Sequence, residues 1–439
     1  MEIYIHIPFC VKKCRYCDFY SVSCGKTTEF GCGEEKTHGS LPKTGDYVKA
    51  LLKELDARIG EIKGKEVTSV FVGGGTPTIL SCNELETLIT GIGSRLNTGV
   101  RGRHEEDPDA EAGRSRARDE SGKVKGLREE KGSGETEFTV ECNPGTIDRE
   151  KLTLMQQLGV NRLSIGLQSA DNGELKALGR IHTYEEFLKN YEEARRAGFD
   201  NINVDLMSGI PGQTAASCEK TLNTVAGLGP EHISVYSLIL EEGTPLYDDV
   251  EAGKVKLPGD DFDRDMYGLT GQILASYGYE RYEISNYARP GRRCRHNMGY
   301  WTGEEYLGIG AAAASYLESA HPGSSSAGSY PEMGRAMLRY KNPNDLKAYL
   351  EDPAGVRVLE ERLEREDLMS EFMILRLRLM RGASKEEFFK RFGVTIADIF
   401  GDVIKKQTKL GLIEDRDGFV SLTSRGLDLA NSVMCEFMP

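Results

Sequence analysis

Strand-like and helix-like runs alternate along the first two-thirds of the chain. Residues 2–7 (EIYIHI) are rich in β-branched and aromatic side chains, and residues 46–59 repeat apolar side chains at helical spacing. The same patterns predict strands at 67–72, 137–141, 161–165, 201–207 and 232–238, and helices near 83–96, 148–158, 184–197 and 215–228.

This alternation indicates parallel strands joined by right-handed crossovers, and therefore an α/β fold. Six such units predict a partial (β/α)6 barrel rather than a closed barrel of eight strands. In that architecture the reactive side chains lie at the carboxyl ends of the strands.

Two segments interrupt the pattern. Residues 23–44 and 98–136 are rich in glycine and charged or small polar residues and contain few aliphatic ones. Such segments cannot bury enough apolar surface to offset the entropy lost on ordering. We expect both to be disordered surface insertions, and residues 322–331 to form a loop or linker.

The last hundred residues have a different pattern, with mainly helical periodicity. Helical patterns at 344–350, 365–380, 385–392 and 396–410 precede a hairpin-like segment with Asp417–Gly418 as its turn. A final helix is expected at 427–437. The order predicts a smaller, mainly helical, winged-helix-like domain. We therefore divide the chain into a barrel (1–290), a connecting segment (291–340) and a C-terminal domain (341–439).

Charge and hydropathy narrow the functional classes. The 439 residues include 56 basic and 69 acidic side chains, giving a net charge of −13. An acidic chain is a poor electrostatic binder of nucleic acid, so no nucleic-acid partner is expected. No apolar run reaches the ~20 residues that span a bilayer, and the N-terminus lacks the basic region of a signal peptide. We expect a cytosolic protein whose thiols stay reduced.

Three closely spaced cysteines follow the first predicted strand. Cys10, Cys14 and Cys17 have the spacing C-x3-C-x2-C. Three thiolates on one loop can hold three irons of a [4Fe–4S] cluster and leave the fourth iron open. A structural zinc site is the alternative, but it needs four ligands, and no fourth ligand stands at zinc spacing. The pattern favours the iron–sulfur cluster.

The cysteine loop resembles the motif of radical S-adenosylmethionine (SAM) proteins. The string YIHIPFCVKKCRYCDFYS is similar to the oxygen-independent coproporphyrinogen III oxidase family and, within it, to the HemW-type heme chaperones. The likeness continues through FVGGGTPT, VECNPGT, RLSIGLQS, LGRIHT, NVDLMSGIPGQT and YEISNYARPGRRCRHNMGYW, and covers most of residues 1–320. It implies a radical SAM barrel with the cluster on the three cysteines.

The resemblance also implies a SAM site at the strand ends. Carboxylates there can accept bonds from ribose hydroxyls, glycines allow close approach of the backbone, and an arginine can pair with a carboxylate. We expect Tyr16 either to pack on the adenine or to shield the cluster. The residues matching SAM contacts in the family are Tyr4, Gly74, Thr76, Glu141, Gln168, Arg180 and Asp205.

Three features favour the heme-chaperone branch over the oxidase branch. Phe19 stands where the oxidase motif has a fourth cysteine, and the cluster loop begins at Cys10, with no room for the oxidase's N-terminal extension. The third feature is the segment HNMGYW, which matches the H-N-x-x-Y-W motif typical of the chaperones. The alternative is an oxygen-independent coproporphyrinogen III oxidase, or another radical SAM enzyme.

The HNMGYW segment is also a candidate heme site. Histidine is a common heme ligand, and tyrosine and tryptophan can stack on a porphyrin. His296, Tyr300 and Trp301 are therefore expected to contact heme, with Cys294 as a second possible ligand. The alternative is that His296 and Asn297 hydrogen-bond a loop while Tyr300 and Trp301 fill the base of the barrel. His6 is expected in the core, and His182 is a further histidine that could line the cavity.

The resemblance implies cofactors and partners as well. They are a [4Fe–4S] cluster, SAM and heme, an electron donor such as flavodoxin or ferredoxin, and heme-acceptor proteins such as respiratory enzymes of the membrane. We therefore expect a cytoplasmic protein with peripheral contact to the membrane.

Overall fold

The computed structural model describes residues 1–24, 42–96, 135–319 and 336–438. Its centre is a run of parallel strands that neighbour one another in sequence order, as the alternating pattern predicted. These strands are β1 (Glu2–Ile7), β4 (Ser69–Gly74), β5 (Glu137–Cys142), β6 (Arg162–Gln168), β7 (Ile202–Ser208) and β8 (His232–Ser237).

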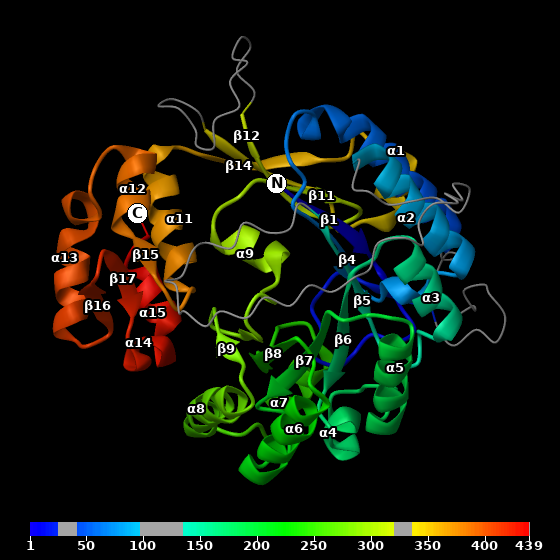
Figure 1. Ribbon diagram of the computed structural model, residues 1–439, viewed down its shortest axis with the longest axis horizontal. Helices are drawn as coiled ribbons and strands as arrows, with labels where there is room; N and C mark the ends of the chain where they lie inside the picture. Colours follow the sequence, from blue (N-terminus) through cyan, green and yellow to red (C-terminus); the bar gives the residue numbers. More distant parts are fainter. Residues whose placement is uncertain (25–41, 97–134, 320–335, 439) are drawn as a thin grey trace, which may run out of the picture.

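Helices cover the outer face of these strands (Figure 1). Their apolar stripes pack on the strand side chains that point outward, and side-chain caps fix several of their starts: Thr183 and Thr214 each form a capping box, and Asp148 accepts from Lys151 N. The covering helices are α1 (Thr44–Ile62), α2 (Cys82–Leu96), α3 (Arg149–Gln157), α4 (Asn172–Ala177), α5 (Tyr184–Arg196) and α6 (Ala215–Leu228).

The sheet extends beyond the six predicted strands, to twelve in the described part of the chain. At one edge β11 (Tyr306–Ile309) pairs parallel with β1 and is followed by antiparallel strands; at the other edge two short antiparallel strands close the row. These additions are β12 (Ala314–Glu318), β13 (Met337–Lys341), β14 (Val358–Leu363), β10 (Asn286–Ala288) and β9 (Glu280–Arg281). Residues 291–340, expected as a connecting segment, thus carry sheet strands.

The remaining elements of the barrel half are short strands, a turn and three helices. A small parallel pair, β2 (Phe9–Cys10) and β3 (Val22–Ser23), frames the cysteine loop, and the 3-10 turn η1 (Pro77–Ile79) follows β4. Helices α7 (Pro245–Glu251) and α8 (Asp260–Ser276) follow β8, and α9 (Arg295–Trp301) inserts between β10 and β11.

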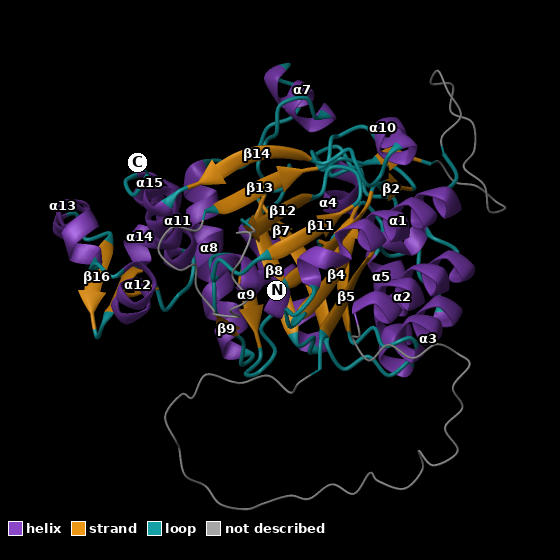
Figure 2. Cartoon of the chain, turned by 90° about the horizontal axis from the view of Figure 1, so that it is seen from above, coloured by secondary structure: helices purple, strands orange, loops and turns teal. Residues whose placement is uncertain are grey.

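The C-terminal domain has its own hydrophobic core, built around Phe372, Met373 and Phe388. Figures 1 and 2 both show it to one side of the barrel, away from α1, α2 and α3. It contains α11 (Arg365–Leu377), β15 (Ala383–Ser384), α12 (Lys385–Phe392), α13 (Ile396–Lys409), β16 (Ile413–Arg416), β17 (Phe419–Leu422), α14 (Ser424–Asp428) and α15 (Ala430–Cys435). The smaller helical domain and its hairpin are as predicted.

Two details of this half differ from the sequence expectation. The helix expected at 427–437 is broken into α14 and α15, because the backbone of Leu429 leaves the helical region (φ −115°, ψ 25°). The turn of the hairpin is as expected, since Asp417 and Gly418 both have positive φ (54° and 83°). The division at 290 and 340 stays a proposal, and the pair β13–β14 crosses its second boundary.

The expected insertions at 23–44 and 98–136 and the expected linker at 322–331 lie largely or wholly outside the described residues. Among the helices of the described ranges, none combines the length and apolarity needed to cross a bilayer.

A buried carboxylate ties the barrel to the segment that follows β13. Glu54 of α1 is fully buried and accepts hydrogen bonds from Asn342 Nδ2 (2.8 Å), Gly310 N (2.8 Å) and Tyr349 Oη (2.7 Å). Tyr349 belongs to α10 (Leu346–Glu351). One side chain thus joins α1, the end of β11 and α10.

Replacing Glu54 tests this junction. Glu54→Ala leaves three buried donors without their acceptor, so we expect a loss of about 3 kcal/mol in unfolding free energy. Urea unfolding followed by circular dichroism measures the loss. Lys53→Ala, at the exposed neighbouring position of the same helix, is the control. A Glu54→Ala midpoint equal to that of the control would contradict the role assigned to this carboxylate.

Candidate functional site at the strand ends

A cavity of about 400 Å³ opens at the carboxyl ends of the parallel strands. Its wall comes from the loop after β1 and from the ends of β4 to β8. Parallel strands bring residues far apart in sequence to one edge, which is where the fold predicts a site. The predicted residues that line it are Cys10, Cys14, Tyr16, Cys17, Gly74, Thr76, Glu141, Gln168, Arg180 and Asp205.

The three cysteines are free thiols on the loop that borders this cavity. Burial raises the pKa of Cys10 and raises that of Cys17 to about 11. Thr76 Oγ1 donates to Cys10 Sγ at 3.6 Å, and Arg180 Nη1 lies 3.5 Å from Cys14 Sγ. A hydroxyl and a guanidinium therefore face sulfurs that would carry negative charge as ligands.

Arg180 is the hub of the cavity floor. Its Nη2 donates to Asn143 Oδ1 (2.5 Å) and to the Gly166 carbonyl (2.6 Å), while its buried Nε has no hydrogen-bond partner. Asn143 in turn donates to Thr76 Oγ1 at 2.7 Å. This chain holds the ends of β4, β5 and β6 together and leaves one donor of the guanidinium unused.

Gly74 permits a close approach that no other residue could make. Its φ is +102°, and a Cβ there would stand 2.3 Å from the His6 ring. Its N–H donates to Glu141 Oε2 at 2.9 Å. The glycine therefore brings the backbone of β4 against the carboxylate at the end of β5.

Two carboxylates, those of Glu141 and Asp205, line the same cavity. Burial raises the pKa of Glu141 to about 7, and the negative charge of Asp205 adds to the shift. Burial also raises the pKa of Asp205, although Asn203 Nδ2 and Ser164 Oγ each donate to it at 2.9 Å. Both carboxylates can accept hydrogen bonds from a polar ligand. A ligand that donates one hydrogen bond to each would offset the electrostatic repulsion between them.

A hydrogen-bonded chain continues from Asp205 into the barrel. Asn203 Oδ1 contacts His232 Nδ1 (2.7 Å), and His232 Nε2 contacts Tyr282 Oη (2.8 Å). Because an amide oxygen only accepts, His232 carries its proton on Nδ1 and accepts from Tyr282. Both ring nitrogens of His232 are thus hydrogen-bonded, and through Asn203 the imidazole is linked to the Asp205 carboxylate.

Gln168 ends β6 with a left-handed backbone (φ 76°), at a register shift between β6 and β7. A glutamine held at positive φ is uncommon, and such strain concentrates at ligand sites. The bulge turns its side chain to the cavity wall.

Tyr4 does not line the cavity in the structure. Its hydroxyl contacts His6 Nδ1 at 3.0 Å, and its ring packs near Phe71 and His296. His6 Nε2 contacts the Tyr20 carbonyl at 2.9 Å, so His6 is a core histidine with both nitrogens bonded, as expected. Tyr4 therefore lies behind His6 and deeper in the barrel than the predicted residues that line the cavity.

The HNMGYW segment forms α9 inside the barrel and away from the cavity. His296 is 2% exposed, stacks on Phe71 (4.9 Å between ring centres) and contacts Ser69 Oγ at 2.6 Å. Tyr300 meets its ring edge-on at 5.0 Å. The thiol of Cys294 is fully buried and lies 3.5 Å from Glu137 Oε1. His296 thus bonds to a residue of β4 rather than to a loop, and Tyr300 packs on it inside the barrel, as the alternative expected for Tyr300.

Trp301 lies at the junction with the C-terminal domain. Arg376 Nη1 donates to its carbonyl at 2.6 Å, and the Arg378 guanidinium stands 4.3 Å above its ring. Trp301 is thus packed between the two halves of the protein, apart from the cavity.

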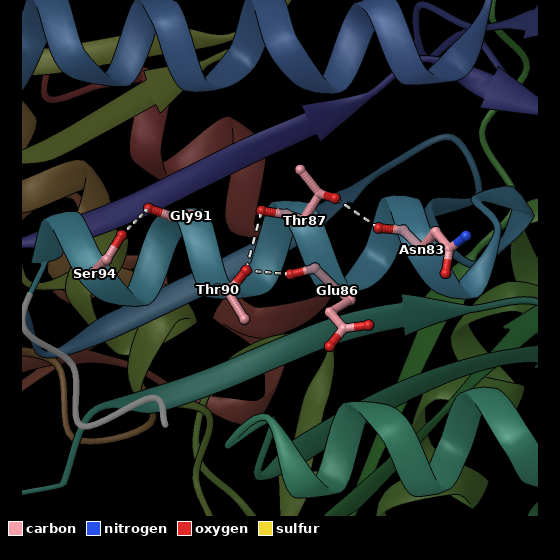
Figure 3. Close-up of a pocket in the computed structure, with 6 residues that line it drawn as sticks. All are labelled: Asn83, Glu86, Thr87, Thr90, Gly91 and Ser94. Carbon is pink, nitrogen blue, oxygen red and sulfur yellow. Dashed lines mark hydrogen bonds between the residues drawn. The ribbon is translucent and has the colours of Figure 1, made fainter. Parts of the chain in front are cut away.

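A second hollow, of about 570 Å³, runs along α2 (Figure 3). Its hydroxyls return to carbonyls of their own helix: Thr87 to Asn83 (2.7 Å), Thr90 to Glu86 (2.5 Å) and Ser94 to Gly91 (3.1 Å). With its hydroxyls satisfied in this way, the hollow offers little to a ligand, and the cavity at the strand ends is the candidate site.

Sequence comparisons with known proteins point to the same class of site as the cysteine-bordered cavity. Residues 4–225 match the family model of the radical SAM superfamily, and residues 363–429 match the HemN C-terminal domain. The chain is 32% identical to the heme chaperone HemW of Bacillus subtilis (99% of this chain, 98% of that protein) and 30% identical to that of Escherichia coli (100% and 98%). The chain belongs to the HemW family of radical SAM proteins.

A solved structure supports the fold. Coproporphyrinogen III oxidase (HemN) from Escherichia coli, described as a radical SAM enzyme, aligns with a TM-score of 0.72 at 22% identity, covering 100% of this chain and 89% of that one. The fold is therefore a radical SAM barrel followed by a helical C-terminal domain.

The residues of the cavity fit the cofactors that radical SAM family membership implies. Three thiols on one loop are the donor set of an iron–sulfur cluster with one open iron. Arg180, the carboxylates of Glu141 and Asp205 and the backbone of Gly74 all line the cavity, so a guanidinium, two carboxylates and a backbone segment border the space that SAM would take. Within the described ranges, no group of three or more His, Cys, Asp or Glu side chains is arranged to hold a single metal ion.

Sequence reasoning missed several cavity residues. Asn143 follows β5 within the VECNPGT string, and Ser164 and Tyr236 sit on strand positions that face inward. The signal available was the alternation of β6 and β8, which predicts which side chains face the barrel interior. Asn143 could have been found because it directly follows Glu141–Cys142 at a strand end.

The raised pKa of Glu141 gives a pH signature. Its folded pKa of about 7 exceeds its unfolded value of 4.5. Its contribution to stability is thus full below pH 4.5 and is lost as pH rises through 7. We expect wild type to lose about 2 kcal/mol relative to Glu141→Gln between pH 5 and pH 8.

Urea unfolding of the cluster-free protein across this pH range measures the difference. Glu150→Gln, an exposed glutamate on α3, is the control and should track wild type. A pH-independent gap between wild type and Glu141→Gln would contradict a neutral carboxyl at this position.

Proposed function

We propose that this protein is a heme chaperone that binds heme and transfers it to acceptor proteins, and that it carries a [4Fe–4S] cluster and SAM. The observation that carries the proposal is the cysteine-bordered cavity in a chain similar over its full length to heme chaperones. The acceptors we propose are respiratory heme enzymes at the membrane.

The cluster would be held by Cys10, Cys14 and Cys17. Thr76 and Arg180 each already face one of these sulfurs, so their positive ends would lie against the negative charge of the bound thiolates. When bound and reduced, the cluster supplies one electron to the SAM sulfonium. We propose flavodoxin or ferredoxin as the class of donor that reduces it.

SAM would occupy the rest of the cavity. Glu141 and Asp205 accept hydrogen bonds from the ribose hydroxyls, and Gly74 offers its backbone to the methionine amino group. Arg180 and Gln168 orient the methionine end, with Tyr16 beside the adenine or the cluster. Tyr4 contributes through His6, on which Gly74 rests. The assembled walls keep water from the reacting bond.

The second candidate is an oxygen-independent coproporphyrinogen III oxidase. The shared fold favours it, because the HemN structure aligns over the whole chain. Against it stands Phe19, which is 65% exposed at the cavity mouth where the oxidase motif has a further cysteine.

Single cysteine substitutions test the cluster. Cys10→Ala, Cys14→Ala and Cys17→Ala each remove one iron ligand, so the iron–sulfur absorbance near ~400 nm should disappear after anaerobic reconstitution. Cys435→Ala, at an exposed free thiol on α15, should keep it. Iron and sulfide analysis checks the spectra, and a full cluster in any of the three variants would refute the ligand assignment.

An anaerobic assay separates the two functions. The reconstituted protein is given SAM, reductant and coproporphyrinogen III, and tetrapyrroles and 5′-deoxyadenosine are separated by chromatography. We expect no protoporphyrinogen from protein with an intact cluster. We also expect hemin-loaded protein to transfer heme to an apo-hemoprotein, followed by its Soret band. Formation of the divinyl product would make the protein an oxidase.

A further inference from the structure

Arg15 joins the cysteine loop to two other segments of the barrel half. It directly follows Cys14, and its backbone is hydrogen-bonded on both sides. Its N–H donates to the Leu178 carbonyl at 3.1 Å, and its carbonyl accepts from Leu246 N at 2.9 Å. Leu178 comes directly after α4, and Leu246 belongs to α7. Partners more than 160 positions away in the sequence thus fix the backbone in the middle of the loop.

The side chain of Arg15 reaches the same two segments. Its Nη1 donates to the Ala177 carbonyl at 3.2 Å, and its Nη2 forms an ion pair with Asp249 of α7. The two paired side chains are 31% and 28% exposed, so water screens this pair only in part. Of residues 10–17, Arg15 is the one that does not line the cavity. Its guanidinium therefore binds the outer side of the loop and not the thiols.

Gly179 leaves the space that the arginine side chain occupies. Its φ is +77°, and a Cβ at this position would stand 2.7 Å from Arg15 Cγ. Any other residue there would push the arginine away from the end of α4. Because Gly179 directly precedes Arg180, the cysteine loop and the floor of the cavity meet at this one point.

A small hydrophobic cluster supports the neighbouring residue of the loop. Tyr16 packs against this cluster, which includes the buried side chains of Leu178 and Leu246. Arg15 and Tyr16 thus anchor the loop side by side, the first by polar contacts and the second by apolar contacts. Neither anchor uses a cysteine, so both are independent of what the thiols bind.

We propose that Arg15 is a positioning residue for the iron–sulfur cluster. Its contacts with Ala177, Leu178, Leu246 and Asp249, the Arg15 clamp, hold the three thiols in one arrangement before and after iron binds. An ordered loop loses less conformational entropy when it takes up a cluster, and contacts behind the ligands strengthen metal binding. The inference rests on the proposed function, because it concerns the cluster that the three cysteines would hold.

Asp249 offers a matched control, because a second cation binds the same carboxylate. Lys254 Nζ lies 3.1 Å from Asp249 Oδ1, and the lysine side chain is 70% exposed. Lys254 stands shortly after α7 in the sequence and not on the cysteine loop. Lys254→Ala therefore removes an ion pair of Asp249 and leaves the Arg15 clamp in place.

The test measures how fast the full-length protein loses its cluster. Wild type, Arg15→Met, Asp249→Asn, the double variant and Lys254→Ala are reconstituted anaerobically. An excess of iron chelator is then added, and the fall in absorbance near ~400 nm is followed. Arg15→Met keeps an unbranched apolar stem beside Gly179 and removes the charge and the donors. Hydrogen exchange of residues 10–17 and the urea midpoint are measured on the cluster-free proteins.

We expect Arg15→Met to lose its cluster at least about tenfold faster than wild type, because a contact that orients metal ligands is removed. Asp249→Asn should lose it about threefold faster, since it removes only a partly exposed ion pair. The double variant should match Arg15→Met, because its second substitution breaks a contact that is already lost. Lys254→Ala should match wild type. Loop amides should exchange faster in Arg15→Met while its urea midpoint stays near that of wild type.

Cluster loss at the wild-type rate in both Arg15→Met and Asp249→Asn would overturn the positioning role and leave the cysteine ligands standing. Equal acceleration in Lys254→Ala and Asp249→Asn would also overturn it, as would a lowered urea midpoint in Arg15→Met without faster exchange in the loop. If Arg15→Met does not fold, the comparison of Asp249→Asn with Lys254→Ala decides. If wild type takes up no cluster, the positioning role and the cluster of the proposed function both fail.

Discussion

The site depends on the parallel register of the central strands. β1, β4, β5, β6 and β7 run in one direction and end at one edge. Residues as distant as Cys10 and Asp205 therefore share a wall. An antiparallel exchange of any of these strands would send its terminal side chain to the opposite end of the barrel.

Arg180 turns that proximity into a fixed geometry. The buried guanidinium donates to Asn143 and Gly166, at the ends of β5 and β6, and to the Cys14 sulfur, and only its Nε is left without a partner. Its positive charge also bears on its neighbours: it contributes to the lowered pKa of His182 and faces the thiols. The same cation thus assembles the floor of the cavity and sets its electrostatics.

Much of this could be predicted from sequence, for physical reasons that differ by element. The six parallel strands have apolar runs bounded by turns, and the cysteine spacing is a local chemical signature. Strands β9 and β10 are short, and β12 to β14 carry mixed polarity, so their positions in the sheet depend on tertiary pairing more than on local sequence. Tyr4 was placed at the cavity by resemblance, whereas its hydroxyl bonds to His6 one layer below, which strand alternation alone does not fix.

The packing of α9 has a practical consequence. Trp301 is the only tryptophan of the chain, and its ring lies under a guanidinium supplied by the C-terminal half. Indole emission responds to a nearby cation and to water. The intrinsic fluorescence of this one side chain therefore reports on the contact between the two hydrophobic cores. Any motion that separates the C-terminal domain from the barrel would therefore change the intrinsic fluorescence of Trp301, and no added fluorophore is needed to follow it.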